Sequence, residues 1–151
     1  MPLEKIEAAT HEDIPLLCEL LAILFKQEED FKPDREKQSE GLRKIISQPD
    51  TGTILVFREG TEIVGMVNLL YTVSTACGGQ VALLEDMIVR PGKRGGKIGS
   101  RLLEAAIAKA QASGCARITL LTDRTNIDAI RFYQRHGFSV SGMIPLRLLI
   151  P

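Results

Sequence analysis

The segment from Arg90 to Arg101 combines glycines and cations in a way that suits a polyphosphate ligand. It carries no acid, although the formal net charge of the whole chain is zero. Its five cations are Arg90, Lys93, Arg94, Lys97 and Arg101. Amides of a glycine-rich turn can approach anionic oxygens closely, and the positive end of a helix dipole favours such oxygens. The segment therefore predicts a phosphate-binding loop that leads into a helix.

Two common phosphate loops do not fit this segment. A Walker loop needs Gly-x-x-x-x-Gly-Lys-Ser/Thr, but Pro91 stands five residues before Gly96, and Ile98 follows Lys97. The dinucleotide fingerprint Gly-x-Gly-x-x-Gly fails because Arg94 takes the place of its first glycine. The loop must belong to another class of phosphate site.

Hydrophobic periodicity predicts the elements that position this loop. Alternation and β-rich composition predict strands over residues 3–8, 53–58, 62–74, 81–90, 117–122, 138–140 and 143–150. Apolar faces with helical spacing predict helices over about 10–27, 33–46, 98–112 and 125–137. Thr10–Asp13 and Thr125–Asp128 have the form of capping boxes. This order predicts an α+β or mixed α/β fold around one sheet.

Length and composition predict one compact domain. The chain has 151 residues, of which 44% are hydrophobic and 25% are charged, and such values exclude disordered or collagen-like chains. We find no internal repeat and no linker, so we expect residues 1–151 to form a single domain. Zero net charge and few aromatic residues argue against nucleic acid or an anionic membrane as a partner.

The cysteines and the N-terminus indicate a cytoplasmic protein. Cys18, Cys77 and Cys115 are odd in number and widely spaced, with no metal-ligand pattern, so we expect structural thiols in a reducing compartment. No signal peptide is evident, and the apolar stretch over residues 16–25 is too short to span a bilayer.

The loop and a downstream segment together resemble the GNAT superfamily of acetyl-CoA-dependent N-acetyltransferases. The pyrophosphate loop of that family is Arg/Gln-x-x-Gly-x-Gly/Ala, of which Arg94 and Gly99 match the ends, while Lys97 replaces the middle glycine. The second signature resembles the family's Asn…Ala…Phe-Tyr…Gly-Phe pattern. Its matching residues here are Asn126, Ala129, Phe132, Tyr133, Gly137 and Phe138.

The resemblance implies a GNAT-like fold, with a mixed, mostly antiparallel twisted sheet of about seven strands flanked by four helices. It also implies acetyl-CoA as cofactor, with backbone groups of Met87, Ile88 and Val89 pairing with the pantetheine arm. The implied contacts of the pyrophosphate are Arg94, Gly95, Gly96, Lys97, Ile98, Gly99 and Ser100. Asn126, Ala129, Phe132 and Tyr133 are implied to lie against the cofactor as well, although Asn126 could instead cap a helix beside Thr125.

Acetylation of an amine needs a group that accepts a proton, because an alkyl ammonium has a pKa near 10.4 and is not nucleophilic at pH 7. Glu85 and Asp86 are adjacent on a predicted strand, so alternation directs them to opposite faces. The Leu84-Glu85-Asp86 segment resembles the diamine and polyamine acetyltransferase branch, which implies Glu85 as the base. Asp86 or a chain of waters remains an alternative.

Tyr133 matches the tyrosine acid of the family. Protonation of a thiolate by an ordinary phenol is uphill by roughly 2 kcal/mol, so hydrogen bonding to the thiolate is the expected role. An amide near Ile88 could stabilise the oxyanion.

These residues predict an N-acetyltransferase that acts by direct attack of a primary amine, from a small molecule or a protein, on the thioester. The alternative is a non-catalytic acyl-CoA-binding or sensor domain. The acceptor is not determined by the sequence, but residues 25–47 and 72–80 are expected to select it, with Asn68 and Tyr71 as candidates to shape its pocket. The apolar end over residues 144–150 could support a homodimer.

Overall fold

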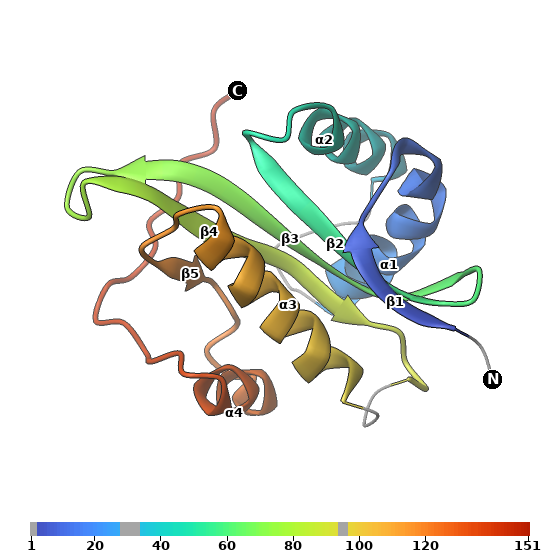
Figure 1. Cartoon of the computed structure of the whole chain (residues 1–151). Coiled ribbons are helices and arrows are strands. Elements are labelled where there is room, and N and C mark those ends of the chain that lie inside the picture. The colour runs from blue at the N-terminus through green and yellow to red at the C-terminus, as the bar shows by residue number, and fades with distance from the viewer. Residues whose placement is uncertain (1–2, 28–33, 94–96) are drawn as a thin grey trace. The chain divides into compact units, whose positions relative to one another are not determined.

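A five-stranded sheet forms the centre of the larger of two compact units in the computed structural model, which describes residues 3–27, 34–93 and 97–151 (Figure 1). This first unit is Met1–Leu121, and the second is Thr122–Pro151. The strands lie in the order β1-β2-β3-β4-β5. Their bounds are β1 (Glu4–Ala8), β2 (Gly52–Glu59), β3 (Glu62–Ser74), β4 (Gly79–Val89) and β5 (Ile118–Leu120).

The sheet is mixed and mostly antiparallel, as the resemblance to the GNAT superfamily implies. Each neighbouring pair from β1 to β4 is antiparallel, and β4 pairs with β5 in parallel. The β3 strand is buried on both faces from Ile63 to Leu69, since helices cover both sides of the sheet there. Figure 1 shows α1 (Ile14–Gln27) and α2 (Arg35–Ser47) on one face, and α3 (Ile98–Ala112) on the other.

The predicted capping box of Thr10 and Asp13 is present on a short 3-10 turn over His11–Asp13, which leads directly into α1. The Thr10 amide donates to the Asp13 carboxylate at 2.8 Å. The same carboxylate, 7% exposed, accepts two hydrogen bonds from the guanidinium of Arg58 on β2, at 2.9 and 2.6 Å. Arg58 also donates to Glu7 on β1. This ion-pair group ties the first helix to the edge of the sheet.

The apolar core between the sheet and the α1–α2 pair supports one wall of the site described below. Leu17, Leu20 and Leu21 of α1 pack with Val56 and Met66 of the sheet, and all five are buried. Cys18 lies in the same core, with its Sγ 3.3 Å from Ser39 Oγ on α2. Cys18, Cys77 and Cys115 are all free thiols.

The second unit contains α4 (Ile127–Arg135), and residues 136–151 form no strand. The strands predicted over 138–140 and 143–150 are therefore wrong for this structure, and the sheet has five strands instead of about seven. Pro145 cannot donate to a sheet ladder. The apolar side chains from Met143 to Ile150 are 69–91% exposed, so no burial against a partner supports a strand.

The capping of α4 also differs from the prediction. The N-cap is Asn126, whose side chain accepts from the Ala129 amide at 3.1 Å, in place of the predicted box of Thr125 and Asp128. Within the described residues, no helix is long and apolar enough to cross a membrane.

Candidate active site

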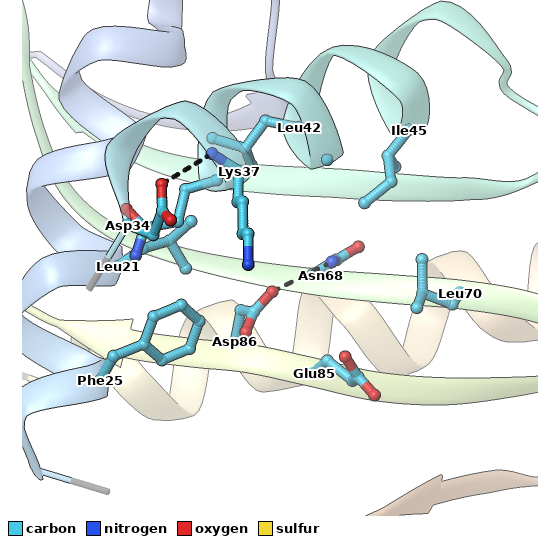
Figure 2. A pocket seen from close by; sticks show the side chains of 12 residues that line it. Leu21, Phe25, Asp34, Lys37, Leu42, Ile45, Asn68, Leu70, Glu85 and Asp86 are labelled. Carbon is cyan, nitrogen blue, oxygen red and sulfur yellow. Dashed lines mark hydrogen bonds between the residues drawn. The ribbon is translucent and has the colours of Figure 1, made fainter. Parts of the chain in front are cut away.

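A β-bulge in β4 brings two adjacent carboxylates to the same cavity. Asn68 on β3 pairs with Glu85, and Met66 pairs with Ile88, so Val67 alone opposes both Asp86 and Met87. Asp86 has a left-handed backbone with φ of +54°. Because the bulge interrupts the alternation of the strand, Glu85 and Asp86 both line the cavity (Figure 2). The prediction that they point to opposite faces is therefore wrong.

The cavity has a volume of about 310 Å³ and lies between the sheet and the α1–α2 pair. One part of its wall is apolar, formed by Leu21, Phe25, Leu42, Ile45 and Leu70. The polar part of the wall is formed by Asp34, Lys37, Gln38, Asn68, Glu85 and Asp86. Such a combination suits a small ligand with both alkyl and polar groups.

Asn68 is the buried polar centre of this cavity. The residue is 2% exposed, and its Nδ2 donates to Asp86 Oδ2 at 3.3 Å. Its Oδ1 is buried and has no hydrogen-bond partner among residues 3–27, 34–93 and 97–151. A buried acceptor with no partner is energetically costly, by about 1–3 kcal/mol, so a donor from a ligand would relieve this cost.

Burial changes the acid–base properties of both carboxyls. Burial, and then the charge of Asp86, raises the pKa of Glu85 above its ordinary value, although solvent still reaches this side chain. Burial also raises the pKa of Asp86, and the hydrogen bond from Asn68 offsets part of that rise. A carboxylate with a raised pKa is a stronger base, and perturbed carboxyls of this kind are typical of catalytic sites.

The pairing of β4 with β5 ends at Leu84, directly before these acids. The parallel ladder joins Ala82–Leu84 to Ile118–Leu120, and β4 then continues for five residues to Val89. Met87, Ile88 and Val89, predicted to bind pantetheine, all lie in this extension. Ile88 is buried at 4% exposed, whereas Met87 and Val89 are half-buried. A strand that extends past its neighbour can accept an extended ligand as a further strand.

The start of α3 is open to an anion. Lys97, the N-cap residue, has a left-handed backbone with φ of +63°, and its side chain does not cap the helix. Ile98, Gly99 and Ser100 form the first turn, which contains no acid. The N-terminal amides and the helix dipole favour negative charge there. Arg94, Gly95 and Gly96, also predicted to bind pyrophosphate, lie outside the described residues.

Three of the five cations around this loop form ion pairs within the protein. Arg90 Nη2 lies 3.2 Å from Glu19, and Lys93 Nζ lies 2.8 Å from Glu59. Arg101 Nη1 lies 2.5 Å from Glu4, with its guanidinium over the Phe57 ring. Three cations of the loop predicted to bind phosphate are therefore paired with carboxylates that are distant in the chain.

Tyr133 lies on α4, in the second unit, among other rings. Its ring centroid is 5.2 Å from Phe132 and 5.6 Å from Phe138, both in edge-to-face geometry. Burial raises the pKa of Tyr133 to about 12, so the phenol is fully protonated at neutral pH. The side chains of Asn126 and Ala129 lie at the start of the same helix, where the Asn126 carboxamide is used as the cap.

Sequence reasoning named Asn68 and Tyr71 without assigning either to a face of the sheet. The structure separates them, because Asn68 lines the cavity while the Tyr71 hydroxyl lies 2.7 Å from Thr53 Oγ1. Lys37 and Gln38 were missed as individual residues, although the segment 25–47 that contains them was expected to select the acceptor.

Comparison with known proteins assigns the chain to a family. The model of the acetyltransferase (GNAT) family matches residues 15–138, which is most of the chain. The chain belongs to the GNAT family. It is therefore an acyltransferase of a family that uses acetyl-CoA. An aminoalkylphosphonate N-acetyltransferase of Salmonella typhimurium is 32% identical over 141 residues, which cover 93% of this chain and 88% of the relative.

Solved structures agree with the GNAT fold. A transcriptional regulator from Bacillus halodurans is 30% identical, with a TM-score of 0.83 and coverage of 98% of this chain and all of that one. A predicted acetyltransferase from Clostridium acetobutylicum, solved with acetyl-CoA, is 15% identical with a TM-score of 0.78 and 96% coverage of each chain. The mixed sheet and four helices are thus those of the family.

Proposed function

We propose that this GNAT protein transfers the acetyl group of acetyl-CoA to the primary amine of a small molecule by direct attack. The observation that carries the proposal is the cavity with two carboxylates of raised pKa beside a buried, unpartnered Asn68 oxygen. An alkylammonium is the ligand group that supplies donors to all three side chains.

The described residues fit acetyl-CoA at two places. Amides at the start of α3, from Ile98 to Ser100, would hold the pyrophosphate, with Lys97 adding a positive charge. The extension of β4 over Met87–Val89 would hold the pantetheine arm through its backbone. Asn126, Ala129 and Phe132 on α4 are further proposed contacts. When bound, acetyl-CoA supplies a thioester whose carbon–sulfur bond breaks as the carbon–nitrogen bond forms, and the sulfur then takes up a proton.

Glu85 is the proposed base. The acceptor amine arrives as an ammonium and must lose one proton before its nitrogen can attack, and a second as the amide forms. The ionised Glu85 carboxylate accepts a proton directly or through water, and it releases that proton to solvent, which reaches this side chain. Asp86, held by Asn68, orients the ammonium with its negative charge.

Tyr133 is the proposed donor to the leaving sulfur. With a pKa of about 12, complete proton transfer to a thiolate of pKa near 8.5 is uphill by about 5 kcal/mol. Tyr133 therefore stabilises the thiolate as a hydrogen-bond donor, and the proton that the sulfur finally acquires comes from solvent.

The relative from Salmonella supports a small-molecule amine as acceptor, since its name specifies an aminoalkylphosphonate. The likeness of Leu84-Glu85-Asp86 to the diamine and polyamine branch supports an amine with a second amino group instead. Both classes are primary amines.

Release of CoA thiol from acetyl-CoA, measured over a panel of amines, tests the proposal. Glu85→Gln is expected to lower kcat by about 10²- to 10⁴-fold, the usual contribution of a general base. Tyr133→Phe is expected to lower kcat by about 10-fold while CoA still raises the Tm. Glu36→Gln and Tyr71→Phe serve as matched controls with unchanged kinetics. CoA binding without turnover of any amine would contradict the proposal and favour a sensor.

A further inference from the structure

Two residues of α2 that line the cavity, Lys37 and Gln38, carry donors for which the described part of the chain offers no partner. The Gln38 Nε2 is buried and has no hydrogen-bond partner. Among the described residues Lys37 forms no ion pair, and Figure 2 shows its side chain extended from α2 into the cavity, towards the sheet. A buried amide donor and an unpaired ammonium on adjacent residues indicate a ligand group that accepts hydrogen bonds and carries negative charge.

The opposite wall has the reverse polarity. Glu85 and Asp86 on β4 provide negative charge, and the buried Asn68 Oδ1 on β3 provides an acceptor that no group of the described residues satisfies. Apart from Asp34, whose carboxylate caps α2, the helix wall therefore carries donors and the sheet wall carries acceptors. A ligand that satisfies both walls has a cationic end and an anionic end.

We propose that the acceptor is a small zwitterion, in which a primary amine and an acid group belong to the same molecule. Its ammonium binds at Glu85, Asp86 and Asn68, and its carboxylate or phosphonate binds at Lys37 and Gln38. This inference rests on the proposed function, because it specifies the substrate class of the same site. At about 30 Å³ per atom, the volume share of a water, a cavity of about 310 Å³ admits about ten non-hydrogen atoms.

A diamine fits this arrangement less well. Its second ammonium would need Asp34 as partner, but the Asp34 carboxylate is exposed and accepts from the Lys37 amide at 3.1 Å as the cap of α2. The same ammonium would also meet the unpaired cation of Lys37. Repulsion between the two like charges disfavours the diamine, whereas an acid group gains from the same cation.

Acceptors of matched length test this proposal. We would compare kcat/KM for propylamine, propane-1,3-diamine, 3-aminopropanoate and 2-aminoethylphosphonate, the last two of which separate a carboxylate from a phosphonate. The wild-type protein is expected to prefer at least one zwitterion over propylamine by 10-fold or more. Lys37→Met is expected to lower kcat/KM for that zwitterion by about 10- to 100-fold, the range for one hydrogen bond to a charged group, and to leave propylamine within 3-fold.

Lys44→Met is the matched control, because Lys44 lies on α2 outside the cavity and is 4.0 Å from Glu40. It should leave all four rates unchanged. Lys37→Glu should reverse the preference towards the diamine. A wild-type preference for the diamine or for propylamine, with Lys37→Met without effect on the zwitterions, would overturn the proposal while leaving amine acetylation intact.

Calorimetric titration of both zwitterions into the protein separates this proposal from the proposed function. Binding that Lys37→Met weakens by 10-fold or more, without turnover of any amine, supports the zwitterion site and contradicts the acetyl transfer. Binding that is equal in the wild type and Lys37→Met contradicts the zwitterion site, whatever the turnover.

Discussion

Lys97 begins α3 in a conformation that glycine adopts more easily, and this allows a two-variant test. Its φ is +63°, and its carbonyl accepts the first hydrogen bond of the helix, from the Arg101 amide at 2.9 Å. A left-handed conformation costs an L-residue about 1–2 kcal/mol. Glycine avoids that cost but loses about 0.4–1 kcal/mol more chain entropy on folding. Lys97→Gly should therefore be more stable than Lys97→Ala by about 0.8 kcal/mol.

Urea unfolding and Tm measurements on both variants would show this difference. A protein of this size changes its Tm by about 2–4 °C per kcal/mol, so Lys97→Gly should melt about 2–3 °C above Lys97→Ala. Both variants lack the ammonium, so the comparison isolates the backbone. The exposed Lys109, in the last turn of the same helix, provides the control. There the Gly variant should be less stable than the Ala variant by about 0.5–1 kcal/mol.

We expect Lys97→Gly to gain stability relative to the wild type but to lose affinity for CoA. If the Lys97 ammonium contacts the pyrophosphate, both Lys97 variants should bind CoA about 2- to 5-fold more weakly, the range for one exposed ion pair. Lys97→Gly would then be more stable than the wild-type protein but would bind CoA more weakly than the wild type. An Ala variant as stable as the Gly variant would refute the left-handed start of α3, and unchanged CoA affinity would refute the phosphate contact.

Three more predictions follow from buried charge, close packing and the acids of the cavity. Arg58→Met leaves the Asp13 carboxylate buried without its partner and should cost about 3 kcal/mol at pH 7 in urea unfolding. Burial opposes ionisation of Asp13, but its hydrogen bonds lower its pKa overall. The stabilisation by the ionised Asp13 is therefore present above pH about 4 and is lost as the pH falls below it. The difference in unfolding free energy between the wild type and Arg58→Met should narrow in the same range. Gly52→Ala places a Cβ 2.5 Å from a carbonyl oxygen of β3 and should cost about 2 kcal/mol, whereas Gly79→Ala, with nothing within 4 Å, should change stability by under about 0.5 kcal/mol. Because burial and the neighbouring carboxylate raise the pKa of Glu85, kcat/KM should fall as the pH drops through a value above the ordinary 4.3, and Glu85→Gln should abolish this acidic limb.

Local patterns in the sequence were sufficient for most elements of the fold. The bounds of β3 and α3 are those predicted. The apolar periodicity of each segment and the turn residues beside it are local in the sequence, so they can be recognised without the fold. The capping box of Thr10 and Asp13 was also predicted correctly, since both partners belong to one helical turn. The second box failed because Asn126, one residue later, is the better-placed acceptor for the amide of Ala129.

Features that depend on contacts between distant segments could not be predicted. The bulge at Asp86 contains no glycine to mark it, and only the pairing of Asn68 with Glu85 defines it. The ion pair of Arg101 with Glu4 joins residues 97 positions apart, so nothing in the sequence indicates that the positive charge of Arg101 is paired within the protein. The apolar residues from Met143 to Ile150 predicted a strand, but no strand among the described residues pairs with them.

The bulge in β4 also constrains how this cavity can change over evolutionary time. Deletion of the extra residue would restore regular alternation, and Glu85 and Asp86 would separate to opposite faces of the sheet. A change of chain length at this point therefore removes the pair of acids in one step. In the proposed site, substitutions on the helix wall, at Lys37 or Gln38, would change only the group that binds the far end of the acceptor amine. If the proposed site is correct, single substitutions on α2 would give access to new acceptors, while β4 would have to keep its length.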